Sequence, residues 1–195
     1  MPQALNSTAR IGTNISHAID LLQQGEVVAI PTETVYGLAG NALNTKAVAR
    51  IFSVKNRPTF DPLIIHTNSL EKVLQFVDEM PAQAKTLAQA CWPGPLTLLL
   101  PRKDSIPDLV TSGLDTVAVR IPNHSLTLSL LEALEFPLAA PSANPFGYIS
   151  PTTAEHVYNQ LGKKIPYILD GGPCLVGIES TIVGFEDGEP TIYRL

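Results

Sequence analysis

The strongest constraint on the fold of this chain is a short apolar run followed at once by hydroxyl side chains and glycines. Residues 27–30 read Val-Val-Ala-Ile, which is typical of a buried strand. Residues 31–40, P-T-E-T-V-Y-G-L-A-G, follow at once; the proline ends the ladder because it has no N–H, and the glycines free the backbone. Since ligands of open α/β sheets lie beyond the carboxyl ends of strands, this stretch predicts the mouth of a ligand site. Taken alone, a surface turn rich in Thr and Gly explains it at least as well.

Apolar segments of helical and strand periodicity alternate along the rest of the chain. Helices are expected within residues 15–22, 47–52, 70–77, 84–91 and 126–135, and strands at 63–65, 96–100, 116–121, 137–140, 167–170, 179–183 and 190–195. Asn14 is expected to cap the first helix, and Asn44 or Thr45 the second. Ser150 is expected to cap a further helix that starts at Pro151, and residues 104–114 are expected to form an exposed loop. The alternation predicts one domain over residues 1–195, with an open, twisted, mostly parallel α/β sheet and helices on its faces.

Composition narrows the class of protein. The 195 residues are 45% hydrophobic and 16% charged, and the formal net charge of −5 argues against a protein that coats nucleic acid. Cys91 and Cys174 show neither a disulfide framework nor metal spacing, so we expect two buried thiols. Residues 1–10 have no apolar core, and no run approaches the ~20 residues of a membrane span. These features predict a soluble, cytoplasmic protein without membrane contact.

Charged and hydroxyl side chains stand at the ends of several predicted strands. They are Lys55, Arg57, His66, Arg120, Ser142, Asn144 and Arg194. Because strands of one sheet bring their ends together, these clusters favour one pocket, suited to a ligand with several phosphates and a small polar co-substrate. The usual phosphate loop, dinucleotide fingerprint, zinc patterns and nucleophile elbow do not occur. Phosphoryl or nucleotidyl transfer fits such a pocket, since that chemistry depends mainly on position and field.

Each of these residues also has a purely structural explanation. Lys55 and Arg57 could form a solvated helix end, and His66 could bond to backbone at the end of its strand. Arg120 requires an anionic partner because an unpaired buried charge is costly, and one of the 18 acidic residues could supply it. Trp92 is expected to be a packing anchor rather than a stacking platform.

Five motifs in order resemble the YrdC/TsaC family, in its short, single-domain form. They are P-T-E-T-V-Y-G-L at 31–38, K-x-R-P with P-L-I-I-H at 55–66, V-A-V-R-I-P at 117–122, P-S-A-N at 141–144 and E-S-T-I-V at 179–183. The resemblance implies a twisted sheet with one large, concave, positively charged cavity. It also implies the synthesis of L-threonylcarbamoyl-AMP from L-threonine, bicarbonate and ATP with release of pyrophosphate. This nucleotidyl transfer supplies the t6A modification of tRNAs that read ANN codons.

Carried over residue by residue, the resemblance implies two catalytic cations and two binding sets. The cations are Lys55 and Arg57, with Lys55 near the bicarbonate or the phosphates. The L-threonine set is Thr34, His66, Arg120, Ala140 and Ser180, where Arg120 suits a carboxylate as a bidentate fork. The ATP set is Arg57, Asp61, Thr116, Ser142, Asn144, Ser150 and Arg194. Mg²⁺ is expected to arrive on the ATP phosphates, with no metal site in the protein.

The resemblance leaves partners and rival functions to be decided. A downstream transferase would pass the threonylcarbamoyl group to tRNA, and tRNA or double-stranded RNA would be a possible ligand. Asp61 stands where the family usually has Asn, so its contact is expected to be with ribose, base or metal. The alternatives are a non-catalytic double-stranded-RNA-binding module, which the net charge of −5 disfavours, and a nucleotide-dependent hydrolase or sensor.

Overall fold

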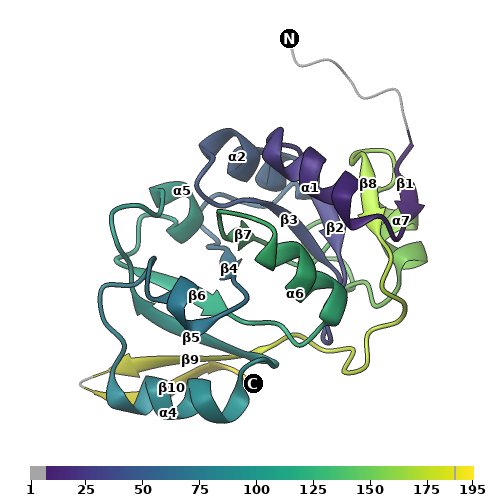
Figure 1. Cartoon of the computed structure of the whole chain (residues 1–195). Coiled ribbons are helices and arrows are strands. Elements are labelled where there is room, and N and C mark those ends of the chain that lie inside the picture. The colour runs from purple at the N-terminus through teal and green to yellow at the C-terminus, as the bar shows by residue number, and fades with distance from the viewer. Residues whose placement is uncertain (1–7, 187) are drawn as a thin grey trace.

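The computed structural model describes residues 8–186 and 188–195, and one open sheet runs through them (Figure 1). Its strand order is β1-β8-β2-β3-β7-β4-β6-β5-β9-β10. The strands are β1 (Arg10–Gly12), β2 (Val28–Ile30), β3 (Gly37–Asn41), β4 (Ile64–His66), β5 (Leu96–Pro101), β6 (Thr116–Arg120), β7 (Leu138–Ala139), β8 (Tyr167–Leu169), β9 (Thr181–Glu186) and β10 (Glu189–Arg194). Each strand expected from the sequence is present, within a few residues of its predicted bounds.

Helices connect many of these strands and cover the sheet. They are α1 (Ile15–Gln23), α2 (Thr45–Lys55), α3 (Leu70–Val73), α4 (Ala82–Cys91), α5 (Asp108–Thr111), α6 (Ser125–Glu132) and α7 (Ala154–Leu161). Asn14 and Asn44 cap α1 and α2 as expected, because each side chain accepts a backbone N–H of the first turn. The α/β class, the open sheet and the helices on its faces are therefore confirmed.

Four details of the prediction are wrong. The sheet is mixed rather than mostly parallel: β1–β8, β2–β8, β4–β6 and β5–β9 are parallel, and the other described pairs are antiparallel. Short connections such as 31–36 allow only antiparallel neighbours.

The predicted loop 104–114 contains α5, whose Val110 is buried. Residues 70–77 form only the single turn α3. Helix α7 starts at Ala154, because Thr153, not Ser150, caps it.

The pleat of the strands sends alternate residues to two separate hydrophobic clusters. In β2, Ala29 faces the cluster that contains α2, whereas Val28 and Ile30 face the cluster that contains α1 and α6. Figure 1 shows α1 and α6 side by side across one half of the sheet. Their cluster ends on β7 at Leu138 and on Ala140 just beyond it.

Beyond β7 the same face of the sheet carries polar residues. Leu138 in β7 is paired with His66 in β4, and His66 is paired with Arg120 in β6. Because directly paired residues project from one face, His66 and Arg120 continue the row that Leu138 begins under α6. Their sequence neighbours Ile65 and Val119 project to the opposite face and lie in the other cluster. Register therefore brings two functional candidates side by side.

The two predicted thiol environments need one correction. Cys91 is exposed, because it occupies the last turn of α4 on the solvent side, whereas Cys174 is partly buried and burial raises its thiol pKa to about 11. Trp92 packs against the larger cluster and its Nε1 donates to the Leu96 carbonyl at 2.7 Å, which confirms a packing anchor.

No helix within residues 8–186 and 188–195 is long and apolar enough to cross a bilayer. The interpretation of residues 1–10 concerns mostly residues 1–7, which lie outside the described range.

Leu98 offers a test of the larger cluster, since it is fully buried in β5. We expect Leu98→Ala to lower the free energy of unfolding by about 2–5 kcal/mol through lost burial and a residual cavity. Leu175→Ala is the matched control, because Leu175 is 90% exposed, and it should change the free energy by less than about 0.5 kcal/mol. Urea denaturation measures both, and equal effects would contradict this account of the core.

Candidate active site

A cavity of about 440 Å³ lies on the polar half of the sheet face. Most residues predicted for ligand binding line it: Thr34, Arg57, Asp61, His66, Thr116, Arg120, Ala140, Ser142, Ser180 and Arg194. They come from strands and loops distant in sequence, which is the convergence that the strand-end clusters predicted. Lys55, Asn144 and Ser150 do not line the cavity.

The floor of the cavity is apolar, which the sequence interpretation missed. Ile64, Leu99, Ala118 and Ile182 line it between the polar residues. Ile64 and Ala118 lie two residues before His66 and Arg120, so the pleat places each pair on one face. Counting back by two from the polar strand ends would have found them. Glu179 and Tyr193 also line the cavity and were not predicted as site residues.

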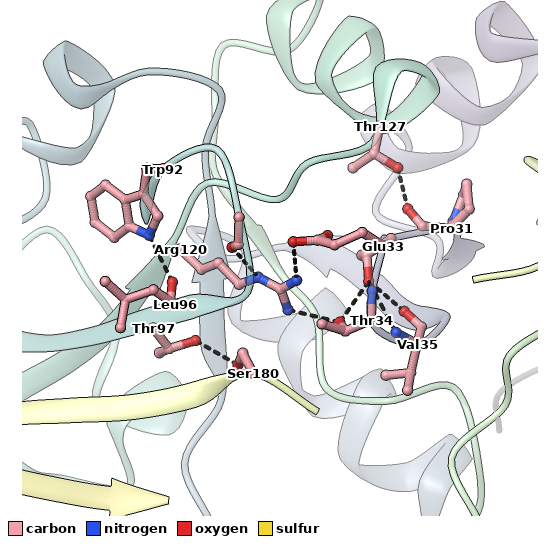
Figure 2. Close-up of polar contacts among 12 residues, drawn as sticks. Pro31, Glu33, Thr34, Val35, Trp92, Leu96, Thr97, Arg120, Thr127 and Ser180 are labelled. Carbon is pink, nitrogen blue, oxygen red and sulfur yellow. Dashed lines mark hydrogen bonds and ion pairs between the residues drawn. The ribbon is translucent and has the colours of Figure 1, made fainter. Parts of the chain in front are cut away.

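Arg120 is the most enclosed charge in the cavity. Its Nη2 lies 2.8 Å from Glu33 Oε1, and the two side chains are only 5% and 6% exposed. Its Nη1 donates to Thr34 Oγ1 at 3.0 Å and its Nε to the Gly94 carbonyl at 3.2 Å (Figure 2). The structural explanation of Arg120, an ion pair with an acidic residue, is therefore realised, and Glu33 is that residue. The guanidinium is held in place from three directions.

The loop that carries Glu33 and Thr34 is rigidly anchored. The Thr32 hydroxyl accepts the backbone N–H groups of Thr34 and Val35, each at 3.2 Å. The carbonyls of Glu33 and Thr34 accept from Val176 and Gly177, which ties this loop to the segment before β9. The hydroxyls in P-T-E-T thus first stabilise the loop, and of these two threonines only Thr34 reaches the cavity.

The other two cavity arginines also face carboxylates. Arg57 Nη2 lies 2.9 Å from Asp61 Oδ1, and Arg194 forms an ion pair with Glu179. The carboxylates are more open here, with Asp61 36% and Glu179 37% exposed. Every arginine that the described residues bring to the cavity is therefore charge-matched. The cavity is not the strongly positive one that the resemblance implied.

Lys55 lies behind the cavity wall. Its side chain is fully buried, and its Nζ donates to the carbonyls of Ser142 and Asn144, each at 2.5 Å. The Asn144 amide in turn donates to the carbonyls of Pro145 and Tyr148. Lys55 and Asn144 thus fix the loop that presents Ser142. Burial, aided by the charge of Arg57, lowers the pKa of Lys55 to about 7.

His66 is a neutral, buried imidazole. Burial and the charge of Arg120 lower its pKa to about 3. Its Nδ1 has no hydrogen-bond partner among the described residues, although His66 lines the cavity. This atom is itself buried, so the cavity lining by His66 does not show that Nδ1 faces a ligand. Backbone hydrogen bonds with Ile64 and Leu138 offset part of this lowering of the pKa, which supports the alternative of a histidine bonded to backbone at the end of its strand.

Hydroxyls and carboxylates complete the C-terminal side. Ser180 Oγ lies 2.8 Å from Thr97 Oγ1 and accepts from Arg194 Nη2 at 3.2 Å. Ser150 donates to Glu179 at 3.1 Å, which explains its position outside the cavity lining. Within the described residues, no three His, Cys, Asp or Glu side chains gather into a metal cluster. This cavity can hold an anion and a small polar group over an apolar floor.

The fold and the cavity define an α/β protein with a candidate ligand site on the polar half of one sheet face. Residues 20–195 match the family model Sua5/YciO/YrdC, described as "Telomere recombination". The chain belongs to this family, which confirms the resemblance seen in the five motifs.

Relatives of this family carry functional names. The chain is 49% identical over 177 residues to a threonylcarbamoyl-AMP synthase of Pyrococcus abyssi, covering 91% of this chain and 52% of that protein. It is 47% identical over 191 residues to one of Bacillus subtilis, covering 96% and 55%. The structure of P. abyssi Sua5 complexed with L-threonine matches with a TM-score of 0.90 and 48% identity, over 92% of this chain and 53% of that one. The chain therefore spans about half the length of these relatives.

The depressed pKa of Lys55 predicts a pH dependence. Between about pH 7 and its unfolded pKa of about 10.4, the unfolded chain binds a proton at Lys55 that the folded chain has lost. The destabilisation by Lys55 is therefore complete below pH 7 and relieved as pH rises. Relative to Lys55→Met, wild-type stability should increase by about 1.4 kcal/mol per pH unit above pH 7. Denaturant unfolding at several pH values measures this, and parallel curves would contradict it.

Proposed function

We propose that this chain is an L-threonylcarbamoyladenylate synthase, a nucleotidyltransferase that acts on L-threonine, bicarbonate and ATP. The observation that carries the proposal is one cavity in which the residues implied for threonine adjoin those implied for ATP. The relatives named threonylcarbamoyl-AMP synthase and the relative complexed with L-threonine support it.

L-threonine occupies the end of the cavity near Arg120. The two N–H bonds of Arg120 that its three neighbours leave free receive the substrate carboxylate. His66 and Ser180 lie beside the threonine hydroxyl, and Thr34 and the Ala140 backbone complete the subsite. A neutral His66 can bond to a hydroxyl without adding charge.

ATP occupies the end near Arg57, Asp61, Thr116, Ser142 and Arg194. Arg57 and Arg194 are the cations that meet its phosphates, and their half-exposed carboxylate partners are the groups that a triphosphate can displace. Asp61 then turns to ribose, base or metal. Lys55, Asn144 and Ser150 act indirectly: Lys55 and Asn144 hold the Ser142 loop, and Ser150 orients Glu179.

The reaction needs position and charge stabilisation more than a protein nucleophile. The neutral threonine amine bonds to the carbon of bicarbonate, which loses water and leaves a carbamate. A carbamate oxygen then attacks the α-phosphorus of ATP, and pyrophosphate leaves with the electron pair of the broken P–O bond. Arg57 and Arg194 stabilise the leaving charge. Mg²⁺ accompanies ATP as part of the substrate, since the described residues offer two separate carboxylates rather than a cage.

The product is a mixed anhydride, and a downstream transferase passes its threonylcarbamoyl group to tRNA in the cytoplasm with release of AMP. The double-stranded-RNA-binding alternative has less support, because the paired arginines give the cavity no excess positive charge along which a phosphate backbone could bind.

Pyrophosphate release from ATP, with threonine and bicarbonate omitted in turn, tests the function. We expect release only when both co-substrates are present, because the attacking carbamate forms from both. Release without threonine would point to a hydrolase or sensor instead. No release under any condition, together with salt-sensitive RNA binding, would favour the RNA-binding module.

Arg120→Lys tests the threonine subsite without leaving Glu33 unpaired. Lys keeps the positive charge but loses the planar fork, so the KM for threonine should rise by about tenfold or more, while the KM for ATP changes less than about twofold. Steady-state pyrophosphate release measures both constants. An equal rise in the two KM values would argue against Arg120 as the carboxylate ligand.

A further inference from the structure

The Arg120–Glu33 pair differs from the other ion pairs of the cavity. Its side chains are almost fully buried, whereas Glu179 and Asp61 are more than one-third exposed. A carboxylate more than one-third exposed can leave its partner and be solvated by water, but a buried carboxylate that loses its partner is left as an uncompensated charge. Glu33 therefore stays with Arg120 when a ligand enters, while Asp61 and Glu179 can be displaced.

The Glu33 carboxylate has Arg120 as its one partner. Its Oε1 lies 2.8 Å from Arg120 Nη2, and no other donor among the described residues contacts either oxygen. Figure 2 shows this carboxylate directed at the guanidinium, beside Thr34. A carboxylate this buried, with Arg120 as its single partner, indicates that its negative charge is required near Arg120.

The pair makes the subsite electrically neutral while leaving N–H groups of Arg120 free. A lone buried arginine would attract any carboxylate or phosphate. Beside Glu33, the same arginine still offers hydrogen bonds, but the net attraction for an anion is cancelled. An amino acid zwitterion has no net charge, and its ammonium lies close to its carboxylate. The neutral pair therefore suits a zwitterion better than an anion.

We propose that Glu33 is a specificity-determining residue: paired with Arg120, it makes this subsite select a zwitterionic amino acid over a carboxylate that lacks the amine. The inference deepens the proposed function and rests on it. Its consequence is chemical. A site that holds ATP beside a bare arginine would admit anions such as hydroxy acids or a second phosphate group. The Glu33 charge disfavours all of these and leaves the amino acid almost unaffected.

Equilibrium binding separates charge selection from simple positioning. The two probes are L-threonine and its α-hydroxy analogue, in which a hydroxyl replaces the ammonium and the net charge is −1. Isothermal titration calorimetry gives the Kd of each for the wild type and for Glu33→Gln. We expect the wild type to favour threonine, and Glu33→Gln to shift the ratio of the two Kd values toward the analogue by about tenfold or more.

Glu26→Gln is the matched control. Glu26 forms an ion pair with Arg50 at 2.7 Å, and neither residue lines the cavity. The same Glu-to-Gln change there should leave the ratio of Kd values unchanged. The melting temperature and the circular dichroism spectrum of both variants establish that they are folded.

Each outcome decides for or against the proposal. Equal weakening of both probes in Glu33→Gln would overturn it and make Glu33 a positioning residue, and an unchanged ratio would also overturn it. If Glu33→Gln does not fold, the wild type alone decides: an analogue that binds as tightly as threonine contradicts charge selection. A wild type that binds neither probe refutes the proposed function instead, so the two failures are distinguishable.

Discussion

The structure depends on the register of three strands, β7, β4 and β6. Their pairing places Leu138, His66 and Arg120 in one row on one face of the sheet. Helices α1 and α6 cover the apolar end of that face, and the polar end lines the cavity. Because the side-chain period of a strand is two, a slip of one residue would exchange His66 and Arg120 for Ile65 and Val119. Core and site are thus fixed by the same hydrogen bonds.

Charge inside the cavity is balanced before any ligand arrives. Arg57, Arg120 and Arg194 each contact a carboxylate, but the pairs differ in burial. In the pairs of Arg57 and Arg194, a triphosphate can replace the partly exposed carboxylate because it carries more charge and water can solvate the displaced carboxylate. In the buried Arg120–Glu33 pair, replacement of Glu33 would leave its negative charge buried without a partner. Ligand binding in this cavity is therefore an exchange of ionic partners at the ATP end and an addition to an intact pair at the threonine end.

Much of the fold and of the candidate site followed from local patterns. The apolar runs predicted the described strands except β1 and β3, and Asn14 and Asn44 marked two helix starts, because capping and periodicity are properties of neighbouring residues. The motifs located most of the cavity residues. Lys55 was expected at the substrates but lies behind the wall, because its long side chain turns toward the carbonyls of Ser142 and Asn144. No pattern near Lys55 could reveal those distant acceptors.

The sequence by itself determined the elements, their order, the family and the residue types that gather at strand ends. Only the tertiary structure decided which charges neutralise one another, that the sheet is mixed, and that an apolar floor underlies the polar rim. The physical reason is the distance along the chain over which each effect acts. Periodicity and capping act over a few residues, whereas Glu33 and Arg120 are far apart in the chain and meet only because two strands and a loop converge. The electrostatic character of a buried site is therefore set by three-dimensional pairing, even where every participant can be read from the sequence.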